Sequence, residues 1–183
     1  MKRILSLLLT LFMLASCATS VTNTDGLGFV ASDGSAVVLD PDNRTKATDL
    51  TATLLDDSGT WRLAAMQRSV VFLNTWGPWC APCRKEIPEL EALYKELGEG
   101  FEVVGFATRT TQSQAEAFLA NKNITYTQVQ DFSSSVIARL DGIPSSTIPS
   151  TIFIDSKGRI AGWALGAADL TLLKSIAKSL MEE

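Results

Sequence analysis

The chain has 183 residues, of which 46% are hydrophobic and 20% charged, with a formal net charge of −4 and no histidine. This composition is that of one ordinary globular domain with an appendage, and the mild acidity argues against nucleic-acid binding. The lack of histidine excludes Ser-His-Asp and Cys-His catalysis and every metal site that needs histidine.

The first sixteen residues have the pattern of an export signal. Lys2 and Arg3 precede the apolar run Ile4–Leu14, which is too short to remain as a membrane-spanning helix. The segment Leu14-Ala15-Ser16-Cys17 that follows resembles a bacterial lipobox. That resemblance implies that Cys17 is lipidated and anchors the protein on the outer face of the bacterial cell membrane. An ordinary cleavage site, with an incidental cysteine, is the alternative interpretation.

Residues 17–47 are expected to form a tether. They are rich in Thr, Ser, Asp and Asn and are interrupted by glycines. Within them Phe29-Val30 and Val37–Leu39 flank Asp33-Gly34, a weak hairpin signal that could add edge strands to the domain. The globular domain is predicted to cover residues 48–183.

The domain reads as alternating strands and helices. Residues 50–63 form a hairpin pattern around a turn at 57–59, and the apolar run Val70–Leu73 predicts a buried strand. A helix over Ala81–Leu97 follows, kinked at Pro88. The later predicted elements are a strand at Phe101–Ala107, a helix opened by the capping box Thr111-x-x-Gln114, a strand at Tyr126–Val129, a short helix from about Asp131 to Leu140 stopped by Gly142, a hairpin of Thr151–Asp155 with Arg159–Trp163, and a last helix capped by Asp169.

Cys80 and Cys83 lie where the buried strand gives way to this first helix, with Pro82 in its first turn. Free N–H groups and the helix dipole favour an anion there, so the thiolate of Cys80 should form readily. Cys80 is therefore the predicted nucleophile, and Cys83 the thiol that releases a mixed disulfide. Two cysteines alone cannot complete a zinc site, which disfavours a metal-binding motif.

The motif and its surroundings resemble the TlpA/ResA-type thiol-disulfide oxidoreductases. The matching residues are Leu73-Asn74-Thr75-Trp76, then Trp79-Cys80-Ala81-Pro82-Cys83-Arg84-Lys85-Glu86-Ile87-Pro88, then Ile148-Pro149-Ser150-Thr151 and Ile154-Asp155-x-x-Gly158. The resemblance implies an α/β thioredoxin fold, in which a central mixed β-sheet is flanked by helices, with an extra N-terminal β-hairpin.

By this resemblance Pro149 should be cis and face the cysteine pair, and Ile148 should offer backbone groups to a bound peptide. A trans proline in a loop is the alternative. Trp79 and Pro82 are expected to shape the substrate-binding surface.

Asn74 stands where cytoplasmic thioredoxins carry a buried aspartate, so the acid for proton transfer should lie elsewhere. Glu86 is the candidate, because a partly buried carboxyl near a forming thiolate has a raised pKa. A carboxylate that merely complements the helix dipole remains an open alternative.

The resemblance implies a membrane-tethered disulfide reductase for protein substrates such as apocytochrome c, recharged by a CcdA-like membrane thiol donor. No dinucleotide fingerprint is present, so no cofactor is expected besides the cysteine pair. Three alternatives stay open: an oxidant that forms disulfides in secreted proteins, a non-catalytic binding module that docks a partner at the Pro149 edge, and a thiol peroxidase. The reduction potential decides between reductase and oxidant.

Overall fold

The computed structural model describes residues 36–140, 143 and 147–183. The predicted signal segment, Cys17, the Phe29-Val30 half of the first hairpin and Gly142 lie outside the described residues. No helix in the described ranges is long and apolar enough to cross a membrane.

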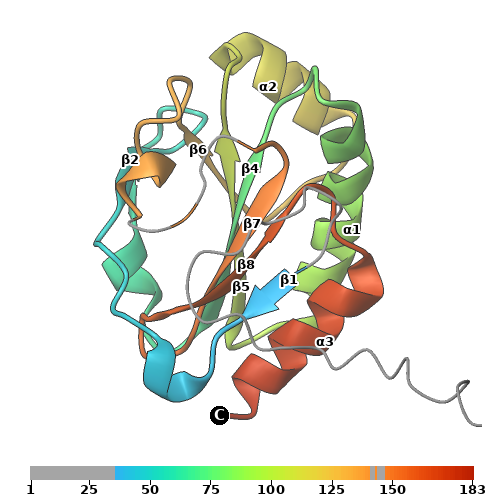
Figure 1. The fold of residues 1–183 in the computed structure, drawn as a ribbon. Helices are drawn as coiled ribbons and strands as arrows, with labels where there is room; N and C mark the ends of the chain where they lie inside the picture. Colours follow the sequence, from blue (N-terminus) through green and yellow to red (C-terminus); the bar gives the residue numbers. More distant parts are fainter. Residues whose placement is uncertain (1–35, 141–142, 144–146) are drawn as a thin grey trace, which may run out of the picture.

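A six-stranded mixed sheet forms the centre of the domain, in the order β1-β8-β7-β4-β5-β6 (Figure 1). Strands β4, β5 and β6 are parallel to one another, whereas β7 and β8 continue the sheet in antiparallel fashion and β1 closes its other edge. The strands are β1 Ala36–Val38, β4 Val70–Trp76, β5 Phe101–Ala107, β6 Thr127–Gln130, β7 Ser150–Ile154 and β8 Ile160–Leu165. This architecture confirms the predicted thioredoxin-type α/β fold.

The two faces of the sheet are covered by different elements. Helices α1 (Ala81–Leu97) and α3 (Leu170–Met181) lie together on one side, and the hairpin that contains β2 lies on the other (Figure 1). Side chains of β4 alternate accordingly: Val70 and Phe72 pack with the helices, and Val71 and Leu73 with the hairpin. The buried strand Val70–Leu73 is confirmed and continues to Trp76, because it pairs with β5 and β7 along its length.

The predicted hairpin of residues 50–63 is present. Strands β2 (Thr51–Thr53) and β3 (Thr60–Arg62) form a separate two-stranded sheet that ends in a 3₁₀ helix, Leu63–Met66. Trp61 packs its edge against Phe106 of β5, with ring centroids 5.5 Å apart. The hairpin thereby seals the sheet face opposite α1 and α3.

Strand β1 pairs with β8, so the sheet includes residues that precede position 48. A short 3₁₀ helix, Pro41–Asn43, follows it. Arg44 is buried there, donates to the side chain of Glu183 (2.9 Å) and forms an ion pair with Asp155. This contact fastens the start of the described chain to its C-terminal residue.

Helix α2 (Gln112–Ala120) begins with the predicted capping box, and α3 with the predicted Asp169 cap. The expected helix from Asp131 to Leu140 is wrong, because only a 3₁₀ helix forms there, Ile137–Arg139. The carboxylate of Asp131 accepts hydrogen bonds from the N–H groups of Val136 (2.9 Å) and Ile137 (3.0 Å). A side chain that bonds the backbone in this way competes with an α-helix over the same residues.

Candidate active site

Cys80 and Cys83 form a disulfide at the start of α1. Their sulfur atoms are 2.04 Å apart and their Cα atoms 5.3 Å apart. Cys80 is the N-cap residue of the helix, and the N–H of Cys83 donates to its Sγ (3.3 Å). Cys83 is fully buried, whereas Cys80 is 4% exposed. A substrate sulfur can therefore reach Cys80 first, and the helix terminus stabilises a thiolate there.

Trp79 and Pro82 are both exposed beside the pair. Trp79 is 52% exposed, yet its indole N–H donates to the carbonyl oxygen of Arg109 (2.9 Å). A Cβ at Gly77 would lie 2.6 Å from the indole nitrogen, so a glycine at this position leaves room for the ring. The indole is therefore held in a fixed position beside Cys80.

The peptide bond between Ile148 and Pro149 is cis. Ile148 packs against the apolar cluster that contains Cys80 and Cys83, while Pro149 is buried and its carbonyl accepts from Gly166 (2.9 Å). Among the described residues, no backbone-to-backbone hydrogen bond uses Ile148. Its N–H and C=O thus fit the strand-like peptide contact that the resemblance implies.

Glu86 is buried below the motif, with only 2% of its surface exposed. Its carboxylate accepts hydrogen bonds from the Asn74 side-chain amide (2.9 Å) and from the N–H of Ala168 (3.2 Å). Burial raises the pKa of Glu86 to about 7, against the opposing effect of these two bonds. Glu86 follows Cys83 by three residues, which places both on the same face of α1.

The partners of Glu86 were not apparent from the sequence. In the sequence, Asn74 differs from the aspartate of cytoplasmic thioredoxins but shows no link to Glu86; its amide also donates to the hydroxyl of Thr151 (3.0 Å). Ala168 lies 82 positions after Glu86, in the loop between β8 and α3, and contributes only its backbone. No local sequence pattern could have indicated that contact.

Trp76 is fully buried and belongs to the same apolar cluster as the cysteine pair. Its indole N–H donates to the side-chain oxygen of Gln128 (2.9 Å) on β6. Gln128 reaches it across Gly105 of β5, where a Cβ would lie 2.2 Å from the Gln128 side chain. The sequence again gave no sign of this contact, which fixes the end of β4 just before the motif.

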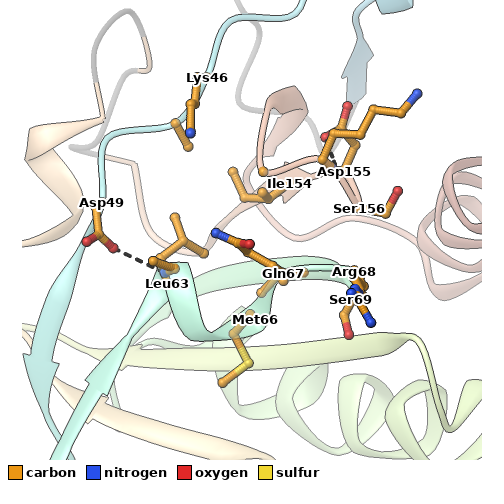
Figure 2. Close-up of a pocket in the computed structure, with 15 residues that line it drawn as sticks. Lys46, Asp49, Leu63, Met66, Gln67, Arg68, Ser69, Ile154, Asp155 and Ser156 are labelled. Carbon is orange, nitrogen blue, oxygen red and sulfur yellow. Dashed lines mark hydrogen bonds between the residues drawn. The ribbon is translucent and has the colours of Figure 1, made fainter.

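A cavity of about 410 Å³ lies at the other end of the sheet (Figure 2). Its lining includes Val71, the second residue of β4, and Ile154, which ends β7, whereas the cysteine motif follows the far end of β4. None of the predicted site residues lines this cavity. Within the described residues, no group of three or more acidic or cysteine side chains could hold a metal ion.

The chain matches a family model, several curated proteins and several solved structures. The model of the AhpC/TSA family matches residues 44–162. The thiol-disulfide oxidoreductase ResA of Bacillus subtilis is 28% identical over 128 residues, 68% of this chain and 70% of the relative. The ResA of Oceanobacillus iheyensis is 30% identical over 119 residues, which cover 64% of this chain and 60% of that protein.

Two solved structures superpose over most of the described fold. A DsbF homologue from Corynebacterium diphtheriae has a TM-score of 0.75 and 30% identity, and the match covers 85% of this chain and all of that one (100%). A secreted thiol-disulfide isomerase from Corynebacterium glutamicum has a TM-score of 0.77 and 29% identity, and the match covers 86% of this chain and 99% of that one.

Proposed function

We propose, given that the chain belongs to the AhpC/TSA family, that it reduces disulfides of proteins outside the cytoplasm while a lipid on Cys17 tethers it to the membrane. The chain is a thiol-disulfide oxidoreductase, because its sequence is related to ResA and it carries the Cys80–Cys83 disulfide at a helix N-terminus. The observation that carries the proposed reduction of disulfides is the buried Glu86, one helical turn beyond Cys83.

The chemistry balances as two successive thiol exchanges. The thiolate of reduced Cys80 attacks one sulfur of the substrate disulfide, and the other substrate sulfur leaves as a thiolate. Cys83 then loses its proton and attacks the Cys80 sulfur, which releases the substrate as a dithiol and leaves the Cys80–Cys83 disulfide. Glu86, with a pKa of about 7, can accept the proton of Cys83 near neutral pH.

Apocytochrome c is the substrate that the TlpA/ResA resemblance suggests, with a CcdA-like membrane thiol donor as the source of electrons. Trp79 is half-exposed, and the Ile148 backbone makes no backbone-to-backbone hydrogen bond among the described residues; both features support a peptide rather than a small molecule as substrate. Two similar solved structures are described as secreted proteins, which supports a site of action outside the cytoplasm. The cysteine pair is expected to suffice without a bound cofactor.

An oxidant of secreted proteins is the second candidate, and one observation favours it. The N–H of Cys83 donates to the Cys80 sulfur at the start of α1, which stabilises the thiolate of the reduced pair. A more stable thiolate makes the disulfide easier to reduce and the protein more oxidising.

The reduction potential of the pair separates the two candidates. Equilibration with dithiothreitol or glutathione buffers, followed by tryptophan fluorescence, should give a potential near or below about −270 mV for a reductase. A value near about −120 mV would instead identify an oxidant. Replacement of Cys80 by Ser should abolish exchange in either case, and a variant that kept its cellular role would be a binding module. Labelling with radioactive palmitate in cells tests Cys17, and an unlabelled protein would contradict the tether.

A further inference from the structure

Arg109 is held rigidly beside the exposed face of the site. It lies in the loop between β5 and α2, with a φ of 49°. Its carbonyl accepts from the Trp79 indole (2.9 Å), and its own N–H donates to the carbonyl of Phe132 (3.0 Å). A residue other than glycine keeps such a left-handed conformation where its surroundings fix it, often at functional sites.

Two arginines beside the motif, Arg84 and Arg109, carry positive charge that no carboxylate in the described part of the chain pairs with. Arg109 and Arg84 are exposed, and neither forms an ion pair with any residue in the described part of the chain. The guanidinium of Arg84 lies 6.0 Å from the ring centroid of Phe118 on α2. The Arg84 side chain therefore lies toward α2, and the backbone of Arg109 lies in the loop that leads into α2.

The two charged groups that follow Arg84 on α1, Lys85 and Glu86, do not pair with this charge. Lys85 forms an ion pair with Glu89 (3.8 Å). Hydrogen bonds from Thr171 lower the pKa of Asp169, and the positive charge of Lys85 contributes to the same effect. Glu86 is buried and faces the interior. A chain with a net charge of −4 thus presents, beside its cysteine motif, two cations that have no ion-pair partner among the described residues.

We propose that Arg109, supported by Arg84, is a specificity-determining residue that makes the protein favour protein disulfides flanked by acidic residues. The inference rests on the proposed reduction of protein disulfides at Cys80. Trp79 offers an apolar surface for the segment around the substrate cysteine, and the arginines attract carboxylates in that segment. Charge complementarity of this kind selects partners and speeds encounter more than it adds affinity.

The expected size of the rate preference for an acidic peptide follows from Coulomb's law. Opposite charges about 7 Å apart change a rate constant by about three-fold in a water-like dielectric, and by considerably more near a protein surface. Because both charges are exposed, about 0.5 M salt should weaken the effect strongly.

The test compares two peptides with the same internal disulfide, flanked by glutamates in one and by lysines in the other. The readout is the ratio of their kcat/KM values, with dithiothreitol as the recycling reductant. This ratio cancels any change in the Cys80 thiolate, which alters both rates alike. Wild-type protein should favour the acidic peptide by about three-fold or more at low salt. Arg109→Glu should bring the ratio to one or below, and Arg109→Lys should keep most of it.

Lys122→Glu is the matched control, because Lys122 is exposed, follows the far end of α2 and has no ion pair among the described residues. Its ratio should equal that of the wild type. A wild-type ratio of one, or a ratio that Arg109→Glu leaves unchanged, overturns the specificity while disulfide reduction stands. Failure of the wild type to reduce either peptide overturns the proposed function itself, and with it this inference.

Discussion

Replacement of Glu86 by Gln should change how the stability of the protein depends on pH. The Glu86 carboxyl has a pKa of about 7 in the folded protein, against 4.5 for an ordinary glutamate, because burial disfavours its charged form. The folded state therefore binds a proton that the unfolded chain has already released between these two values. Stability from this residue is fully present below pH 4.5 and is lost as pH rises through 7.

The size of the loss follows from the two pKa values. A difference of about 2.5 pKa units, at about 1.4 kcal/mol for each, corresponds to about 3 kcal/mol of unfolding free energy. Glutamine carries no charge at any pH, so Glu86→Gln lacks this contribution. From pH 4 to pH 8, the wild type should lose about 3 kcal/mol relative to the variant. Urea unfolding of the oxidised proteins, followed by tryptophan fluorescence, measures both profiles.

A control variant, Glu96→Gln, should change the pH dependence of stability in the opposite direction. Glu96 is exposed, and a hydrogen bond from Lys174 lowers its pKa, so Glu96→Gln should remove stability that is present above the ordinary pKa of glutamate. Parallel profiles for wild type and Glu86→Gln would refute the reasoning, since they would mean that Glu86 titrates alike in the folded and unfolded protein. Such a constant vertical offset between the two profiles would leave Glu86 with a packing role only.

Three further predictions concern the fold and the exchange steps. Gly162→Ala should destabilise the protein in thermal unfolding by about 1–3 kcal/mol, because its Cβ would lie 2.0 Å from a carbonyl oxygen of β1. Unchanged thermal stability would contradict that clash. Gln128→Leu should cost about 1–3 kcal/mol in urea unfolding, since it leaves the buried Trp76 N–H without its acceptor; Gln128→Glu, which keeps an acceptor, is the comparison. Cys83→Ser should accumulate a substrate mixed disulfide on Cys80 that mass spectrometry detects, and its absence would argue against Cys80 as the attacking thiol.

Local patterns predicted most elements because the same residues satisfy local and tertiary requirements. Val70–Leu73 is apolar at every position, and these residues lie in a part of the sheet that is covered on both faces. Thr111 and Gln114 cap α2 with bonds that need only three residues of spacing. The prediction of a helix after Asp131 was wrong, because the Asp131 carboxylate accepts hydrogen bonds from the backbone there and so competes with the helix.

The contacts that fix the site could not be read from the sequence because they join distant segments. The Trp79 indole bonds a backbone carbonyl thirty positions away, and Glu86 bonds the N–H of Ala168. A backbone group is the same for every residue type, so such a contact leaves no trace in the amino-acid sequence. Only the arrangement of β5, β8 and α1 brings these groups together.

Asn74 and Glu86 together explain why this chain departs from cytoplasmic thioredoxins just before the motif. The Asn74 amide nitrogen is 2.9 Å from the Glu86 carboxylate, in a site where both residues are buried. An aspartate at position 74 would place two carboxylates at hydrogen-bond distance, and like charges so close cannot both ionise. With an amide at position 74, the site holds a single buried acid whose charged form accepts a hydrogen bond. The buried acid of this site therefore lies on helix α1, three residues after Cys83, rather than on strand β4.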